Sequence, residues 1–241
     1  QVQDSSGLLT HQQQWVYDEL GRQMQALDAF GQVRQTHYDV SDNPVAETDP
    51  RTHTHNYAYD GLNRLIRHTD PLNGTTQYTY DREHNLTQVR DPRGVTTRYT
   101  YDGLNNLREL ASPDAGTETF THDAAGNVLT HTDARGQVAA YQYDALNRLT
   151  RIDYAGAPEY SVVYEYDATH AGNPGIGRLT AVQDASGRID YRYNLWGQVV
   201  EERHSRDGQV YVLGYLYDSA GRLSVLTYPT GRQVQYIYDL L

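Results

Sequence analysis

The stretch Tyr80–Asp102 decides the fold: it reads YDREHNLTQVRDPRGVTTRYTYD and begins and ends with the same Tyr-Asp pair. Six consecutive steps of 21 residues join equivalent positions along the chain, and the later steps are 23, 27, 24 and 21 residues long. The equivalent positions are Tyr17, Tyr38, Tyr59, Tyr80, Tyr101, His122, Tyr143, Tyr166, Tyr193, Tyr217 and Tyr238. Self-similarity at such a period predicts a repeat architecture, in which one supersecondary unit recurs and stacks on its neighbours.

Each repeat contains two turns of the same kind. If the equivalent Tyr is position 0, the first seven repeats have Asp at position 1 and Gly, Asn, Asp or His at position 4. The residues at position 4 tolerate a left-handed backbone, so this pattern predicts a type I turn that ends in a residue with positive φ. Ten residues later, segments such as Asp49-Pro50-Arg51-Thr52 predict a second turn. Each repeat is therefore two short strands and two tight turns.

Apolar residues on the predicted strands recur with a period of two. Positions −2 and 0 form an aromatic pair in most repeats, such as Tyr78 and Tyr80. Alternate residues of a strand share a face, so stacked repeats are expected to carry two rows of rings on one face. The other strand has Leu or Val at position 6, such as Leu86, and often an apolar residue three positions on, such as Val89. That spacing indicates either a β-bulge or a strand with apolar residues on both faces.

Composition excludes several classes of function. The net charge of −11 argues against nucleic acid, because binding a polyphosphate requires a cationic surface. An acidic solvated face or a cationic protein partner is compatible with this charge. The chain has no Cys, which excludes disulfides and thiolate metal sites. It has no apolar run of about 20 residues that would span a membrane, and no signal peptide is visible.

The whole chain, residues 1–241, is expected to be a single repeat array. Repeats are regular over residues 17–143 and longer and irregular over residues 143–238. In the irregular part the turn after Asp167 is enlarged by residues 168–175. No helical periodicity is convincing, so we predict an all-β fold. Its expected form is an antiparallel β-hairpin repeat array of about 20 strands in a curved or spiral sheet.

The two ends of the chain lie inside repeats. The sequence opens at Gln1 without Met, and Asp4–Gly7 is expected to be the second turn of a preceding repeat. The last residues, 238–241, begin a new repeat. We therefore expect a fragment of a longer protein. Its free strand edges are expected to pair with the remaining repeats or, edge to edge, with a second copy.

The motif Tyr-Asp-x-x-Gly/Asn-Arg/Asn-Leu followed by Asp-Pro-x-Gly, at 21-residue spacing over nearly the whole chain, resembles the Rhs or YD repeat. Proteins with this repeat include bacterial Rhs polymorphic toxins, the B and C components of Tc toxins, and teneurins. The resemblance implies a β-sheet strip that spirals into a hollow cocoon around a toxic C-terminal or partner domain. It also implies that the chain is secreted, or delivered to a cell surface, as part of a larger protein.

This sequence departs from the full family pattern. The self-cleaving C-terminal region of the bacterial proteins is missing, and Asp91-Pro92-Arg93-Gly94 matches only four letters of its motif, at an ordinary second-turn position. No toxin domain is present. The chain is therefore predicted to be a non-catalytic structural segment of the shell and not an enzyme.

Candidate site residues are few, and each has a structural interpretation. His53 and His55 stand two residues apart and would supply half of a metal site, but no third ligand is evident. His122 replaces the repeat Tyr and is expected to fill its place. The many Asp residues start turns, where their carboxylates accept backbone N–H bonds. We therefore assign no catalytic, cofactor-binding or metal residue and expect no cofactor.

An alternative function is a carbohydrate-binding or cell-surface interaction scaffold that uses the aromatic rows. Exposed Tyr and Trp rings stack on sugars, and a sugar site is expected to use a few rings clustered in an irregular loop. A shell is expected to use the rings of every repeat. The uniform recurrence of the rings favours the shell.

Overall fold

The computed structural model describes residues 2–3, 9–11 and 13–239 and is all-β. The described part holds 23 strands and two single-turn 3₁₀ helices. The chain divides into two compact units, Gln1–Thr117 and Glu118–Leu241. The turn expected at Asp4–Gly7 lies outside the described residues.

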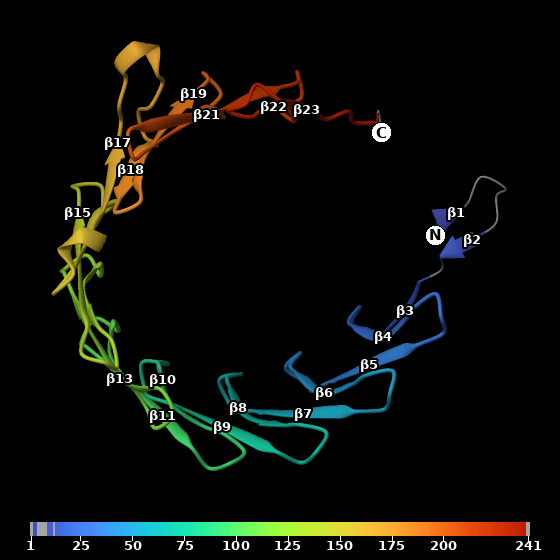
Figure 1. The fold of residues 1–241 in the computed structure, drawn as a ribbon. Helices are drawn as coiled ribbons and strands as arrows, with labels where there is room; N and C mark the ends of the chain where they lie inside the picture. Colours follow the sequence, from blue (N-terminus) through green and yellow to red (C-terminus); the bar gives the residue numbers. More distant parts are fainter. Residues whose placement is uncertain (1, 4–8, 12, 240–241) are drawn as a thin grey trace. The chain divides into compact units, whose positions relative to one another are not determined.

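The N-terminal unit is an antiparallel meander in which each strand from β3 to β12 pairs with the next one along the chain (Figure 1). A separate two-stranded sheet, β1–β2, precedes it. The strands are β1 (Val2–Gln3), β2 (Leu9–His11), β3 (Gln14–Tyr17), β4 (Gln23–Leu27), β5 (Val33–Tyr38), β6 (Pro44–Thr48), β7 (Thr54–Tyr59), β8 (Leu65–Thr69), β9 (Thr75–Tyr80), β10 (Leu86–Arg90), β11 (Thr96–Tyr101) and β12 (Leu107–Ser112). The predicted hairpin array is therefore confirmed in this unit.

The C-terminal unit continues the same pattern from β13, which begins just before the unit boundary, to β23. Its irregular part contains the two 3₁₀ turns and the longest strands. The elements are β13 (Gly116–His122), β14 (Val128–Thr132), β15 (Val138–Tyr143), β16 (Leu149–Tyr154), η1 (Pro158–Tyr160), β17 (Val162–Tyr166), η2 (His170–Gly172), β18 (Leu179–Asp184), β19 (Gly187–Tyr193), β20 (Val199–Arg206), β21 (Gln209–Tyr217), β22 (Leu223–Thr227) and β23 (Gln233–Gln235).

The first turn of the regular repeats, residues 17–143, has the predicted geometry. In the turn after β7, the Asn63 N–H donates to the Asp60 carbonyl at 3.0 Å, and Asn63 has a φ of 59°. The Asp60 N–H in turn donates to the Arg64 carbonyl, also at 3.0 Å. Five non-glycine residues at position 4 have positive φ: Asp42, Asn63, His84, Asn105 and Asn147. This is a type I turn closed by a left-handed residue, a common hairpin loop that places a β-bulge beside the turn.

A β-bulge in the second strand of each hairpin explains the irregular apolar spacing. Tyr80 lies opposite Leu86, but the next residue back, Thr79, lies opposite Gln88. Thr87 is thus the extra residue of the bulge, and Val89 falls opposite Tyr78. Leu86 and Val89 consequently share the face that carries the Tyr rings. Of the two interpretations of the sequence, the bulge is confirmed.

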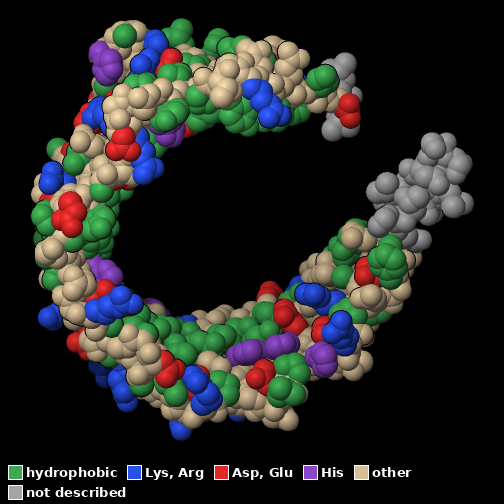
Figure 2. All heavy atoms as spheres, in the orientation of Figure 1, with side chains coloured by type: hydrophobic (Ala, Val, Ile, Leu, Met, Phe, Trp, Pro, Cys, Tyr) green, Lys and Arg blue, Asp and Glu red, His purple; other side chains and the backbone are tan. Residues whose placement is uncertain are grey.

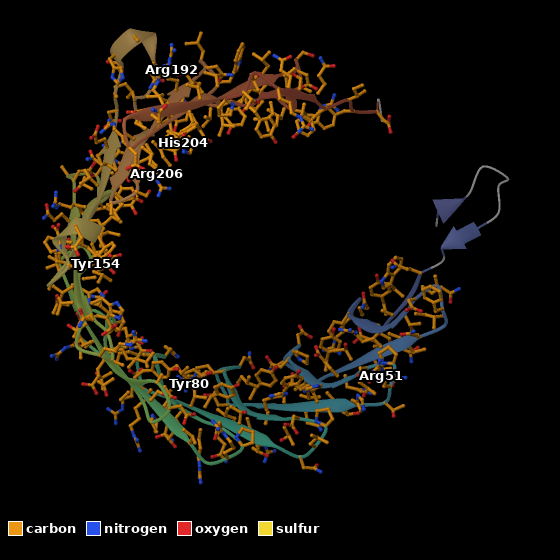
Figure 3. All side chains as sticks on the ribbon, viewed as in Figure 1. Arg51, Tyr80, Tyr154, Arg192, His204 and Arg206 are labelled. Atoms are coloured by element: carbon orange, nitrogen blue, oxygen red, sulfur yellow. The ribbon has the colours of Figure 1, made fainter. Side chains whose placement is uncertain are left out.

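The sheet of each unit is a single layer without a closed core. Among the described residues no large side chain is fully buried, and only the small Ala139 and Ala181 are buried apolar residues. The N-terminal unit is curved, and Tyr80 points to its concave side (Figures 1 and 3). Hydrophobic and His side chains gather along that face of the unit (Figure 2). Stability therefore comes mainly from contacts between neighbouring hairpins, as in other repeat proteins.

Candidate functional site: the tyrosine face

In most repeats the Tyr at position 0 connects the repeat to the one before it. The Tyr80 hydroxyl donates to the carbonyl oxygen of Leu65 at 2.9 Å, and the Tyr101 hydroxyl donates to that of Leu86 at 2.9 Å. The same bond joins Tyr38 to Gln23, Tyr59 to Pro44, Tyr166 to Leu149, Tyr193 to Leu179, Tyr217 to Val199 and Tyr238 to Leu223. The acceptor is the residue at position 6 in every case except Leu179, which the enlarged turn after Asp167 displaces to position 13. In each case the acceptor lies where the bulge interrupts the ladder. The hydroxyl explains why this position is Tyr, since Phe would leave the carbonyl without that donor.

Arg residues at position 5, or displaced by the enlarged turn in the case of Arg178, cover several of these rings from one side. The Arg64 guanidinium lies 4.7 Å from the centroid of the Tyr80 ring, and the same residue pairs with Asp60 at 2.7 Å. It also donates to the carbonyl of Asp81, in the turn of the next repeat, at 3.2 Å. Equivalent stacking occurs for Arg22 on Tyr38, Arg148 on Tyr166, Arg178 on Tyr193 and Arg222 on Tyr238. One side chain thus joins its own turn to the ring and turn of its neighbour.

The turn carboxylates are occupied by hydrogen bonds within their own turns. Asp60 accepts the Arg64 guanidinium and the backbone N–H groups of Arg64 and Leu62, and these bonds lower the pKa of Asp60. The pKa of Asp123 is lowered in the same way. The hydrogen bond from the Asn127 side-chain amide has the larger effect and the bond from the Asn127 backbone N–H the next. These groups stay ionised and stabilise turns. Carboxylates with lowered pKa values that are held in such hydrogen bonds are poorly placed to transfer protons.

A polar cluster interrupts the apolar rows in the N-terminal unit. His55 Nδ1 lies 2.8 Å from His68 Nε2, and the two rings are within 8° of parallel. The Tyr57 ring stacks on His68 with centroids 5.0 Å apart, and its hydroxyl donates to Glu47 at 3.2 Å. Burial, followed by the Glu47 charge, raises the pKa of Tyr57. These residues line a half-open hollow of about 430 Å³ together with Arg34.

The pair His53 and His55 is not brought together as a metal site. His53 Nδ1 lies 3.1 Å from Asp49 in the second turn, whereas His55 contacts His68 on the next strand. No group of three or more His, Asp or Glu residues is placed to hold a metal ion in the part of the chain that the structure describes. The sequence did not reveal the contact between His55 and His68, because it depends on the bulge that shifts β8 against β7.

His122 occupies the place of the repeat Tyr, as its spacing predicts. It lies opposite Val128 on the neighbouring strand, where the other repeats have a Tyr opposite an aliphatic residue. Its Nδ1 is buried and has no hydrogen-bond partner within the described residues. The imidazole fills the position of the phenol ring without reproducing the hydroxyl bond.

We call the sheet face that carries the rings of positions −2 and 0 the Tyr face. The C-terminal unit carries two further carboxylate–histidine pairs on this face. His131 Nε2 lies 2.8 Å from Glu118, and His204 Nε2 lies 3.2 Å from Glu202. Burial, followed by the charge of Glu202, raises the pKa of Tyr215 to about 12. The sequence pattern did not identify these pairs, because His131 and Glu202 stand at a position that is apolar in other repeats, such as Val89. A His or Glu at such a position was the available signal, as at Glu47, His68, His131 and Glu202.

The longest strands frame a hollow of about 670 Å³ in the C-terminal unit. Its apolar lining comes from Val182, Ile189 and Leu213. His204 and Arg206, both labelled in Figure 3, line it as well, on adjacent Tyr-face positions of β20. The hollow is half open to solvent, and its lining combines apolar and charged side chains, as contact surfaces commonly do.

The segment Asp91–Gly94 is an ordinary second turn. The Asp91 carboxylate accepts the Val95 N–H at 2.8 Å and the Arg93 guanidinium at 2.8 Å. Gly94 closes the turn with a φ of 85° and donates its N–H to the Asp91 carbonyl. The geometry is that of the other second turns, such as Asp49–Thr52.

The family model described as RHS Repeat matches residues 17–54, 59–96, 80–117, 122–158 and 175–210, which is more than half of the chain. No curated protein sequence matches the chain. Three of the similar solved structures are TcdB2-TccC3-Cdc42 and TcdB2-TccC3, each with a TM-score of 0.73, and the Tc holotoxin pore of Photorhabdus luminescens, with a TM-score of 0.72. Each is 19% identical to this chain. The match covers 95% of this chain and 14% of the chain of the solved structure. The likeness is one of fold, over about a seventh of those chains.

Proposed function

This chain belongs to the RHS repeat family, and on that premise we propose that it is a non-catalytic segment of a shell wall in a larger toxin-type protein. The wall encloses a toxic C-terminal or partner domain. The chain forms one continuous array over residues 1–241 and pairs with the remaining repeats at its strand edges. It is secreted or delivered to a cell surface with that larger protein. No described helix is long and apolar enough to cross a membrane.

The observation that carries this proposal is the use of the Tyr hydroxyls. In repeat after repeat the hydroxyl at position 0 binds the backbone of the preceding repeat, as Tyr80 binds Leu65 and Tyr217 binds Val199. A hydroxyl that donates its hydrogen to the backbone inside the sheet has none left to donate to a ligand. The rings therefore serve the continuity of the wall, and their apolar face is available to a folded or unfolded chain on the concave side.

Single cysteines in the full-length parent protein test the proposal. The chain itself has no Cys, so in a parent whose other cysteines are replaced, Thr76→Cys and Gln77→Cys form a matched pair. Thr76 lies on the Tyr face opposite His68, and Gln77 lies on the other face of the same strand, β9. A maleimide joined to a large polymer is expected to label Gln77→Cys quickly and Thr76→Cys only after denaturation.

The same pair in the isolated chain is the control. There both cysteines are expected to react at similar rates, because no second layer covers either face in the described residues. Equal labelling of both positions in the native parent protein would show that the Tyr face is open to solution. The shell proposal would then be wrong.

Carbohydrate binding is the alternative, and one feature favours it. Trp196 is 83% exposed at a turn of the irregular part, beside a hollow of about 610 Å³ that is also lined by Tyr215, Tyr217 and Asp218. Aromatic rings beside polar groups suit sugar recognition. A glycan array probed with the chain and with Trp196→Ala tests this function. Binding of one glycan class that is lost in the variant would establish it.

A further inference from the structure

Three exposed Arg side chains share one face of the N-terminal unit: Arg67 on β8, Arg90 on β10 and Arg98 on β11. Each stands next to a Tyr-face residue in its own strand, so the three point to the opposite face. Tyr80 points to the concave side of this unit (Figure 3), which places the three Arg on its convex side. We call these three residues the Arg patch.

The register of the strands brings the members of the Arg patch close together. Arg67 and Arg90 both lie opposite Gln77, on the strands at either side of β9. Two strand spacings put their Cα atoms about 10 Å apart. Arg98 is the diagonal neighbour of Arg90 across β10 and β11, at about 7–8 Å. The three guanidinium groups are therefore within reach of one short ligand.

The Arg patch has no partner of its own. None of its three side chains makes an ion pair or a hydrogen bond in the part of the chain that the structure describes. Among the strand residues between 14 and 112, this face has one carboxylate, Glu109 on β12. Glu109 lies opposite Thr100 and pairs with none of the three. The positive charge of the patch is therefore open to another molecule.

The corresponding face of the C-terminal unit is different, because its strand Arg residues are paired with carboxylates. Arg151 contacts Asp153 at 2.8 Å, Arg188 contacts Glu165 at 2.6 Å, and Arg192 and Arg203 contact Glu201 at 3.8 Å and 3.5 Å. The chain thus neutralises such Arg side chains in one unit and leaves them unpaired in the other. A cluster of unpaired cations suits a partner of complementary charge.

The surroundings of the Arg patch limit the size of that partner. The turns at both ends of these strands begin with Asp, such as Asp81 and Asp91, whose carboxylates accept hydrogen bonds from their own turns. A strand of this length spans about 17–20 Å, so the patch lies between two rows of negative charge. A membrane surface or a long polyanion would extend over these rows and be repelled. A short anionic segment that runs across the strands avoids them.

We propose that the Arg patch binds a short acidic peptide segment of another protein. Arg67 and Arg90 each bind one carboxylate through paired N–H groups, and Arg98 adds charge beside the second. In a polyproline II segment, residues three apart share a side and are about 9 Å apart, close to the spacing of Arg67 and Arg90. The exposed amide of Gln77 lies between them and is free to bind the peptide backbone. The site lies on the convex side and does not depend on the shell function.

Fluorescence anisotropy with a labelled peptide of three Glu-Pro-Pro repeats tests the proposal at low ionic strength. The unaltered chain is expected to bind this peptide, and added salt is expected to weaken the binding. A peptide of three Gln-Pro-Pro repeats is expected not to bind. Arg67→Gln with Arg90→Gln is expected to bind the acidic peptide at least about tenfold more weakly. Both side chains are exposed and unpaired, so this variant is expected to melt like the unaltered chain.

Arg192→Gln with Arg203→Gln is the matched control, because it removes the same charge from the corresponding face of the C-terminal unit. It is expected to bind the acidic peptide like the unaltered chain. Absence of binding to the unaltered chain, or equal weakening in the two double variants, would overturn the proposal. Tighter binding of phosphatidylserine vesicles or of a single-stranded oligonucleotide through Arg67 and Arg90 would also overturn it, because the patch would then serve a membrane or a nucleic acid.

Discussion

The hydroxyl of Tyr101 donates a hydrogen bond of 2.9 Å to the carbonyl oxygen of Leu86, one repeat earlier in the chain. Leu86 stands at the bulge, where the regular ladder between β9 and β10 is interrupted. On the side of β11 the strand pairing ends at Gln88 and Arg98, so the phenol supplies the Leu86 carbonyl with a donor from the next hairpin. The same relationship recurs between successive repeats, so one residue type accounts for much of their coupling.

Replacement of Tyr101 measures that coupling. Tyr101→Phe keeps the ring and removes the bond, and is expected to lower the free energy of unfolding by about 1 kcal/mol. The sequence alone predicts a buried ring and a cost of about 3–5 kcal/mol for Tyr101→Ala. Because the ring is only half-buried in a single-layer sheet, we expect about 2 kcal/mol instead. Urea denaturation followed by circular dichroism measures both values.

Tyr154 supplies the control for Tyr101. It lies outside the aromatic rows, at the end of β16, and is 40% exposed. Tyr154→Phe and Tyr154→Ala are each expected to cost less than the matching change at Tyr101. Equal costs at the two positions would mean that the hydroxyl bond does not couple the repeats.

Gly126 tests the left-handed turn. It occupies position 4 with a φ of 86°, a conformation that a β-branched side chain adopts only with strain. Gly126→Val is expected to destabilise the chain by about 1–3 kcal/mol. Gly126→Asn is expected to be tolerated, because Asn63, Asn105 and Asn147 have φ values of 59°, 66° and 59° at that position. Thermal unfolding of the two variants separates them, and an Asn variant as unstable as the Val variant would contradict the assignment.

The sequence predicted the local geometry because turns and bulges depend on residues close together in the chain. Asp at position 1 and Gly or Asn at position 4 determine the turn, and the spacing from Leu86 to Val89 required a bulge or a two-sided strand. The period then predicted the order of the hairpins. These features hold in both units.

The contacts between repeats were not predictable in the same way. Arg64 reaches Tyr80 and the Asp81 carbonyl only because the next hairpin lies beside its own turn. The pairing of His55 with His68 depends on the register across β7 and β8. A polar residue at an apolar position also gives no indication of its partner. Three-dimensional proximity decides these contacts, and the sequence pattern alone does not contain it.

Acid is expected to weaken the turns that are held by Asp carboxylates with lowered pKa values. Hydrogen bonds from the Arg64 side chain and from the backbone lower the pKa of Asp60 in the folded chain, and Asp123 is affected in the same sense by Asn127. A depressed folded pKa contributes stability that is present above the ordinary Asp value of about 3.9. That stability is lost as the pH falls through the lower folded values. Melting temperatures measured from neutral pH downward are expected to drop below about pH 4.

A matched variant identifies the groups responsible for the acid effect. Asp60→Asn keeps a turn-forming side chain, as Asn194 does in the irregular part, but carries no titrating carboxylate. Its melting temperature is expected to be lower than that of the unaltered chain at neutral pH and to approach it in acid. A difference that stays constant with pH would show that the Asp60 charge does not contribute.

Alkali is expected to act through the Tyr face. Burial, followed by the charge of Glu202, raises the pKa of Tyr215 to about 12, above the ordinary value of about 10. A raised folded pKa means that stability is fully present below pH 10, because neither state is then ionised. It falls between about pH 10 and 12, where the unfolded chain loses the phenol proton more readily than the folded one. Denaturation monitored across this range is expected to show that loss.

Glu202→Gln separates the charge from the burial. The substitution keeps a hydrogen-bond acceptor beside Tyr215 and removes the negative charge that opposes phenolate formation. Ultraviolet absorbance of the phenolate, taken as the difference between each protein and its Tyr215→Phe derivative, isolates this one residue among 22 Tyr. The Tyr215 pKa is expected to fall toward 10 in the Glu202→Gln background while remaining above it, because burial persists. An unchanged titration would mean that Glu202 has no electrostatic effect on the ring, and burial alone would then account for the raised value.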